Sequence, residues 1–213
     1  MSDADESVWP ELVRLMHRSS VDVDALPVDP RRGRAVVDEL QLTERSTLGA
    51  IAANTGGLLI DSGWLRILGG GAPGLPSLSE GNSGGRARSH LVVAFDALGG
   101  RFAIDGGGLG VAAGEVCYWG PDTLAWSGIG GGHSAFVSWA LDGGLGEFYG
   151  PLRWNGWRED TVSLPADQGW SFYPPPFSRE GQDANAVSRA PVPLAELHSF
   201  YAEAARQLNG GER

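Results

Sequence analysis

The stretch that most constrains the fold is residues 90–126, where four short apolar runs alternate with glycine-rich turns. The runs are rich in β-branched and aromatic residues and are bounded by Gly, Asp and Pro, which is typical of short strands. They span residues 91–95, 101–104, 115–119 and 123–126. Because the turns between them are short, each run can pair with the next, and the pattern predicts an antiparallel meander.

Helical periodicity surrounds this meander. Apolar residues recur at helical spacing after Ser7, after Thr43 or Ser46, and after Ser134, each of which can cap a helix. The clearest helix is predicted for residues 193–210, with proline at its start and Asn-Gly at its end. Two further short strands, at residues 58–60 and 64–68, are predicted on either side of a tight Asp61-Ser62-Gly63 turn.

These elements predict an α+β fold: an antiparallel β-meander sheet packed by N-terminal, central and C-terminal helices. We expect a single domain over residues 1–177, a polar linker over 178–192, and a C-terminal helix over 193–210 that packs back on the domain. Residues 19–32 are expected to be a turn-rich connector. A short helix is predicted near residues 145–149, and a strand near 161–164.

Residues 69–85 are rich in glycine, proline and serine and are expected to form a mobile surface loop. Gly69, Gly71 and Gly74 match G-x-G-x-x-G after a predicted strand. A dinucleotide site would need a helix to begin at this point, however, and two prolines occupy that position. Residues 106–108 are a second glycine run, which could present backbone N–H groups to an anion or simply form a turn.

The formal charge of −10 disfavours nucleic acid as a partner, because phosphate binding needs clustered cations. It favours a protein partner with a basic surface through electrostatic steering. The N-terminus lacks the basic start and apolar stretch of a signal peptide, and no apolar run approaches membrane-spanning length. We therefore expect a cytoplasmic protein that does not bind membranes.

Signs of catalysis are weak. The four histidines fall on separate predicted elements without metal-ligand spacing, and the single Cys117 lies in a predicted strand, so we expect no metal, no cofactor and no reactive thiol. Ser134 follows His133, and Asp105 or Asp122 could orient that histidine. Adjacent residues at a helix start point in different directions, however, so a helix-cap role accounts better for Ser134.

The best candidate for a binding surface lies in the aromatic, proline-rich segment 144–177. Trp, Tyr and Arg dominate the energetics of protein interfaces. The densest group of such residues is Arg153, Trp154, Trp157, Arg158 and Trp170.

Three interpretations of this segment stay open. The first is a non-enzymatic protein-binding module. The second is a small-ligand or carbohydrate-binding protein, or a hydrolase, that uses the aromatic region with Asp160, Asp167 or His133. The third is structural: the tryptophans close one end of the core.

Residues 41–71, 95–110 and 114–126 together resemble an uncharacterised bacterial family known only as a domain of unknown function. The resemblance covers roughly residues 8–177 and implies no activity, because that family has none assigned. A more distant likeness is to the SUKH superfamily of immunity proteins and cell-wall regulators. It lies in the helix-to-strand entry at 48–57, the G-x-V-x-[YW] strand at 114–119 and the Ser-x-Phe helix start at 134–136. That likeness implies an α+β domain that binds other proteins without catalysis.

Overall fold

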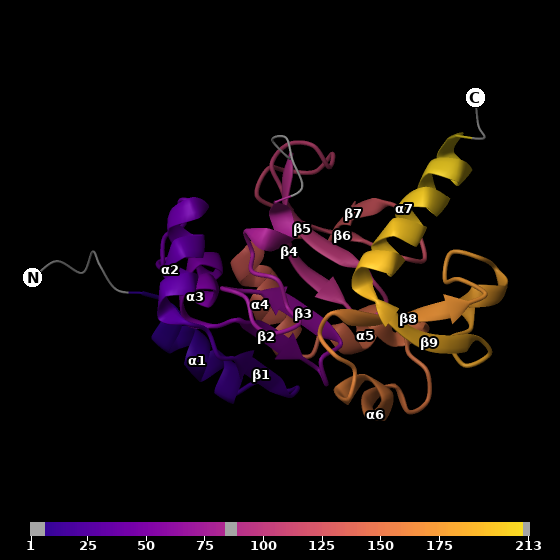
Figure 1. Ribbon diagram of the computed structural model, residues 1–213, viewed down its shortest axis with the longest axis horizontal. Helices are drawn as coiled ribbons and strands as arrows, with labels where there is room; N and C mark the ends of the chain where they lie inside the picture. The colour runs from indigo at the N-terminus through magenta and orange to yellow at the C-terminus, as the bar shows by residue number, and fades with distance from the viewer. Residues whose placement is uncertain (1–6, 84–88, 211–213) are drawn as a thin grey trace, which may run out of the picture.

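The computed structural model describes residues 7–83 and 89–210 and places a seven-stranded antiparallel sheet at its centre (Figure 1). Each strand pairs with the next one along the chain, so the sheet is a continuous meander. The α+β class and the antiparallel meander are confirmed. The strands are β1 (Val23–Leu26), β2 (Gly57–Ile60), β3 (Leu65–Leu68), β4 (His90–Asp96), β5 (Arg101–Asp105), β6 (Val116–Trp119) and β7 (Trp126–Gly128).

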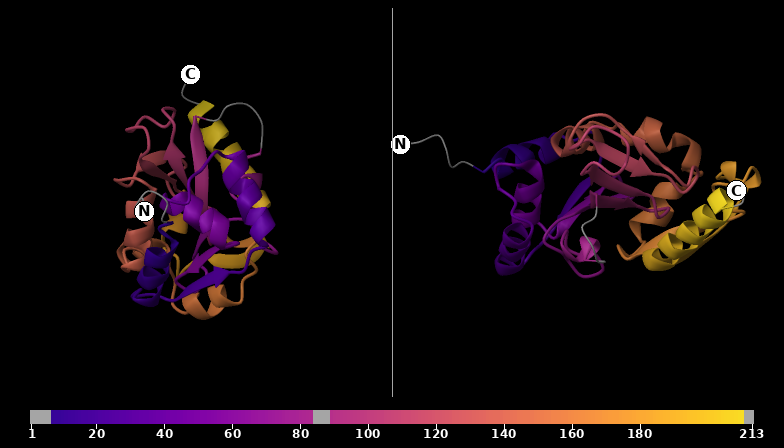
Figure 2. Two further views of the ribbon diagram at one scale, coloured as in Figure 1. Left: turned by 90° about the vertical axis from the view of Figure 1, so that its left-hand side faces the viewer. Right: turned by 90° about the horizontal axis from the view of Figure 1, so that it is seen from above.

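Side chains alternate between the two faces of the sheet, and different helices cover each face. Phe102 on β5 pairs with Tyr118 on β6, and Phe102 packs on Phe136 with ring centroids 4.8 Å apart. This face lies under α4 (His133–Leu141) and α5 (Leu145–Tyr149). The adjacent residue Trp119 points to the opposite face and packs on Tyr201 of α7 (Leu194–Gly210), with ring centroids 6.1 Å apart. This helix is yellow in Figure 2. The meander is therefore covered on both faces, which explains why its strands are almost continuously apolar.

Three helices gather beside the β1 end of the sheet: α1 (Trp9–His17), α2 (Pro30–Glu39) and α3 (Thr47–Asn54) (Figure 1). Ser46 caps α3, since its Oγ accepts a 3.0 Å hydrogen bond from the Gly49 amide. The region expected to be a connector, residues 19–32, instead contains β1 and the start of α2. Extended residues 23–26 find a hydrogen-bonding partner in β2 that local sequence does not reveal.

The glycine-rich segment 69–83 is not the mobile surface loop that was expected; residues 84 and 85 of that prediction lie outside the described residues. Gly69, Gly70, Leu75 and Leu78 are buried, and a short 3-10 helix, η1 (Glu80–Asn82), follows. A Cβ atom at Gly69 would lie 2.5 Å from the carbonyl oxygen of Thr55. Glycine is needed here because two backbone segments pass too closely for any side chain.

The C-terminal third differs most from expectation. Two strands, β8 (Gln168–Tyr173) and β9 (Ser188–Pro193), form a separate antiparallel hairpin. The last residues of the expected linker 178–192 are thus a paired strand. Residues 161–164 do not form the expected strand, because α6 (Trp157–Val162) ends within them. Two 3-10 helices complete the segment, η2 (Gly150–Leu152) and η3 (Glu180–Gln182).

Two buried charged residues join this C-terminal part to the sheet. Arg66 on β3 donates hydrogen bonds to the carbonyl oxygens of Ala166, at 3.0 Å, and Gln168. The Asp96 carboxylate accepts hydrogen bonds from the hydroxyls of Tyr118, at 2.8 Å, and Tyr149, at 3.0 Å. Burial raises the pKa of Asp96 and lowers that of Arg66 to about 10. The hydrogen bonds of these two side chains connect the sheet to residues 144–177 and fix the position of that segment relative to the sheet.

Candidate functional site

Three of the five predicted binding residues meet at the turn between β2 and β3. The Asp61 carboxylate, only 2% exposed, accepts hydrogen bonds from the Nη2 atoms of Arg153, at 2.6 Å, and Arg158, at 3.2 Å. Trp157 lies against both guanidinium groups, whose carbons are 3.8 and 4.5 Å from its ring centroid. We call Asp61, Arg153, Trp157 and Arg158 the Arg–Trp cluster.

The electrostatics of this cluster leave one cation facing solvent. Burial lowers the pKa of Arg153, and the adjacent Asp61 carboxylate opposes that shift. The Arg153 side chain is 7% exposed, whereas that of Arg158 is 58% exposed. Since one carboxylate faces two guanidinium groups, the cluster presents local positive charge on a protein whose net charge is −10.

Trp154 and Trp170 lie in another environment. Trp154 is 2% exposed, packs on Trp170 and Phe172 at 5.7 Å each, and donates a 2.6 Å hydrogen bond from its indole to Asp160. It belongs to the core that attaches the β8–β9 hairpin, and only a small edge of it reaches the surface. The structural interpretation holds for Trp154, because its large apolar ring is stabilised more by burial than by exposure.

The surface beside the Arg–Trp cluster is a shallow hollow of about 430 Å³, lined by Gly146, Gly150, Arg153, Trp154, Asn155, Trp157 and Arg158. One turn further along α6, Val162 is 69% exposed. A stacked Trp–Arg pair, an exposed aliphatic side chain and a hollow thus lie on or next to one short helix. The role of Asp61 is not visible in the sequence, because its Asp-Ser-Gly context indicates only a turn.

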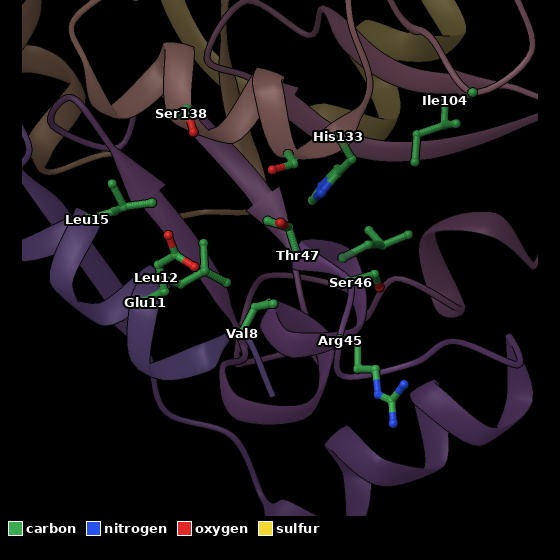
Figure 3. Close-up of a pocket in the computed structure, with 13 residues that line it drawn as sticks. Val8, Glu11, Leu12, Leu15, Arg45, Ser46, Thr47, Ile104, His133 and Ser138 are labelled. Carbon is green, nitrogen blue, oxygen red and sulfur yellow. The ribbon is translucent and has the colours of Figure 1, made fainter. Parts of the chain in front are cut away.

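A second hollow, of about 520 Å³, lies between α1, the start of α3 and the first turns of α4 (Figure 3). Leu12, Leu15 and Ile104 form part of its apolar wall, and Thr47, Ser134 and Ser138 contribute hydroxyl groups. We call it the α4 pocket. Its lining includes no residue of the segment 144–177, so His133, one of the three residues that the hydrolase hypothesis offered, does not share a site with the aromatic region.

His133 is the first residue of α4 and is 8% exposed, and its imidazole points toward Thr47 (Figure 3). Within the part of the chain that the structure describes, neither of its ring nitrogens has a hydrogen-bond partner. Burial lowers the pKa of His133 to about 4, so the ring is neutral at pH 7. A buried polar group without a partner costs roughly 1–3 kcal/mol, which makes His133 an unusual feature that needs a functional or structural reason.

The remaining candidates have structural roles. The glycine run 106–108 does not offer an open anion site, because Asp105 Oδ1 accepts hydrogen bonds from the amides of Gly107, Gly108 and Leu109. Gly132, not Ser134, is the N-cap of α4. Cys117 is buried in β6, and burial raises the pKa of its thiol.

The described ranges, 7–83 and 89–210, contain no group of three His, Cys, Asp or Glu side chains placed to hold a metal ion. Nor does any helix within them have the length and apolar character needed to cross a membrane.

The molecule is an α+β domain with a surface cluster and a pocket but without a recognised catalytic arrangement among the residues described. The chain belongs to the DUF2625 family, whose members are described as proteins of unknown function, and the family model matches residues 1–197. It is 37% identical to the uncharacterized protein YbfG of Escherichia coli K12, over 92% of this chain and 90% of that protein. It is 31% identical to an uncharacterized protein of Haemophilus influenzae, over 94% of each chain. The resemblance to an uncharacterised bacterial family is thereby confirmed.

Proposed function

We propose that this protein is a non-enzymatic binding module that docks a protein partner on the Arg–Trp cluster. The observation that carries the proposal is the contact of Trp157 with two arginines that are held by one buried carboxylate. Trp and Arg supply much of the binding energy at protein interfaces. Because the ion pairs already fix the side chains, little conformational entropy is lost when a partner binds.

The charges suggest how the partner is recognised. The net charge of −10 steers a basic protein toward this one at long range. At short range, Arg158 offers a cation to a carboxylate or carbonyl group, and Val162 offers apolar surface beside it. A neutralising role, as the likeness to the SUKH superfamily implies, and a scaffolding role are both compatible with such a surface. We place this activity in the cytoplasm.

The test compares two charge-reversal variants of the full chain, Arg158→Glu in the cluster and Arg34→Glu on α2. Both residues are exposed and both substitutions change the net charge equally, but α2 and α6 lie apart in the fold (Figure 1). Tagged wild-type protein and both variants are used to capture proteins from cells that express the native gene, and bound proteins are quantified by mass spectrometry. We expect a partner that the wild type and Arg34→Glu retain and Arg158→Glu loses.

Thermal melting checks that both variants stay folded, which we expect because Arg158 is mostly exposed and Arg153 still neutralises Asp61. If every partner of the wild-type protein is retained by Arg158→Glu, the Arg–Trp cluster is not the docking surface and the proposal fails.

A further inference from the structure

We propose that the α4 pocket binds a small organic anion, with the carboxylate or phosphate group placed between His133 and the helix starts of α3 and α4. This site is separate from the Arg–Trp cluster and does not depend on the protein-binding role. The first observation is His133 itself, a buried imidazole that points into the pocket and has no hydrogen-bond partner in the described structure (Figure 3). A ligand with polar atoms would supply the partner that the protein does not.

The second observation is the orientation of the helices. Two helices begin at this pocket: residues 46–48 line it at the start of α3, and His133 and Ser134 line it at the start of α4. The first amides of a helix have no acceptor within the helix, and its N-terminus carries partial positive charge. Gly132 gives α4 no side-chain cap, so its first turn depends on another acceptor. Ser46 already caps α3 through the Gly49 amide, so the uncapped start of α4 contributes most to the preference for a negative group.

The third observation is the composition of the walls. Ser134 and Ser138 lie one helical turn apart and offer hydroxyl donors, whereas Leu12, Leu15 and Ile104 offer an apolar surface. A volume of about 520 Å³ lies in the range of small-molecule sites. The pocket therefore suits a ligand with an apolar body and one anionic end, and does not suit a bare inorganic ion.

The charged groups of the lining indicate which way the ligand lies. Glu11 on α1 would repel an anion, and Figure 3 shows it across the pocket from His133. Arg45, just before α3, is the cation of the described lining. We therefore place the anionic end at His133 and the apolar body toward α1. An anion at this position also stabilises the protonated imidazole, so binding is coupled to proton uptake by His133 and strengthens as the pH falls.

Three six-carbon probes test the proposal: hexanoate, hexyl phosphate and hexanamide, each titrated into the full-length protein and followed by NMR. Hexanoate and hexanamide share one pentyl chain, hexyl phosphate has a chain longer by one methylene, and only hexanoate and hexyl phosphate are anionic. We expect at least one of these anions to bind about tenfold more tightly than hexanamide. Chemical-shift changes should centre on Thr47, His133 and Ser134. Comparison of hexanoate with hexyl phosphate distinguishes a carboxylate site from a phosphate site.

Ser134→Glu places a carboxylate at the second position of α4, where it suits the helix but occupies the proposed anion position. We expect it to fold normally and to lose anion binding. The matched control, Ser127→Glu on β7, makes the same substitution at an exposed residue outside the pocket and should bind as the wild type does. Equal affinity for hexanamide, no saturable binding of either anion, or unchanged binding in Ser134→Glu would each overturn the proposal.

Discussion

Asp61 has a backbone conformation that is uncommon for residues other than glycine, and its carboxylate pairs with two arginines. Its φ of 54° lies in the left-handed region, where Asp and Asn are among the best-tolerated residues other than Gly. Its carboxylate is the shared partner of Arg153 and Arg158, which come from a segment about ninety residues later in the chain. Asp61 therefore connects the sheet to the segment 144–177 through ion pairs. A substitution that removes the charge but keeps the backbone conformation tests these ion pairs separately from backbone strain.

We predict that Asp61→Asn lowers the free energy of unfolding by about 3 kcal/mol, because it leaves the mostly buried Arg153 without a counter-ion. Asparagine keeps the shape of the side chain and tolerates the same φ. Urea denaturation followed by circular dichroism measures the change. Arg158→Ala serves as the control and should cost less than about 1 kcal/mol, since Arg158 is mostly exposed. Equal losses in the two variants would contradict this account.

The segment 69–83 shows how a glycine-rich stretch can be a rigid element. Its backbone is held by hydrogen bonds: the Gly70 amide donates to the carbonyl oxygen of Thr55, at the end of α3, at 2.7 Å, and the Leu78 amide donates to that of Gly69, within the segment, at 2.8 Å. Glycines in this segment allow two backbones to approach closely, whereas glycines in flexible linkers increase the conformational freedom of the chain. The segment supports the entry into β2 and so the position of the β2–β3 turn.

Gly69→Ala should therefore destabilise the protein by roughly 2–3 kcal/mol, because the added methyl group meets the carbonyl oxygen of Thr55. The same substitution at Gly146 on α5, where a Cβ meets nothing within 4 Å, should be neutral or stabilise by up to about 1 kcal/mol. Thermal unfolding of both variants compares the two environments directly. A flexible segment at 69–83 would make the two substitutions similar in effect.

At the scale of the whole molecule, buried histidines couple stability to pH. Burial lowers the pKa of His133 and of His198 to about 4, compared with about 6.5 in the unfolded chain. Below pH 6.5 the unfolded state therefore binds more protons than the folded state. Stability contributed by these neutral rings is complete above pH 6.5 and is lost as the pH falls toward 4.

We predict that the free energy of unfolding falls between pH 6.5 and pH 4, and that His133→Gln reduces the fall by about 3 kcal/mol, following the shift in its pKa. Urea unfolding at half-unit pH intervals measures both curves. The difference between the wild-type and variant stability curves reports the contribution of His133 alone. It excludes that of Asp96, whose raised pKa increases the free energy of unfolding as the pH falls. Parallel curves for the two proteins would show that His133 does not titrate between the folded and unfolded states.

The amino-acid sequence by itself determined the α+β class, the meander between residues 90 and 119, the turn at Asp61 and the clear C-terminal helix. These depend on periodicity and turn residues within a few positions of each other, which act in any context. Tertiary structure alone decided that Trp154 is core while Arg158 is surface, that Asp61 pairs with both arginines, and that His133 faces a pocket. It also decided that residues 188–193 pair with β8. The physical reason is distance along the chain: burial and ion pairing of these groups depend on partners that only the complete fold brings into contact.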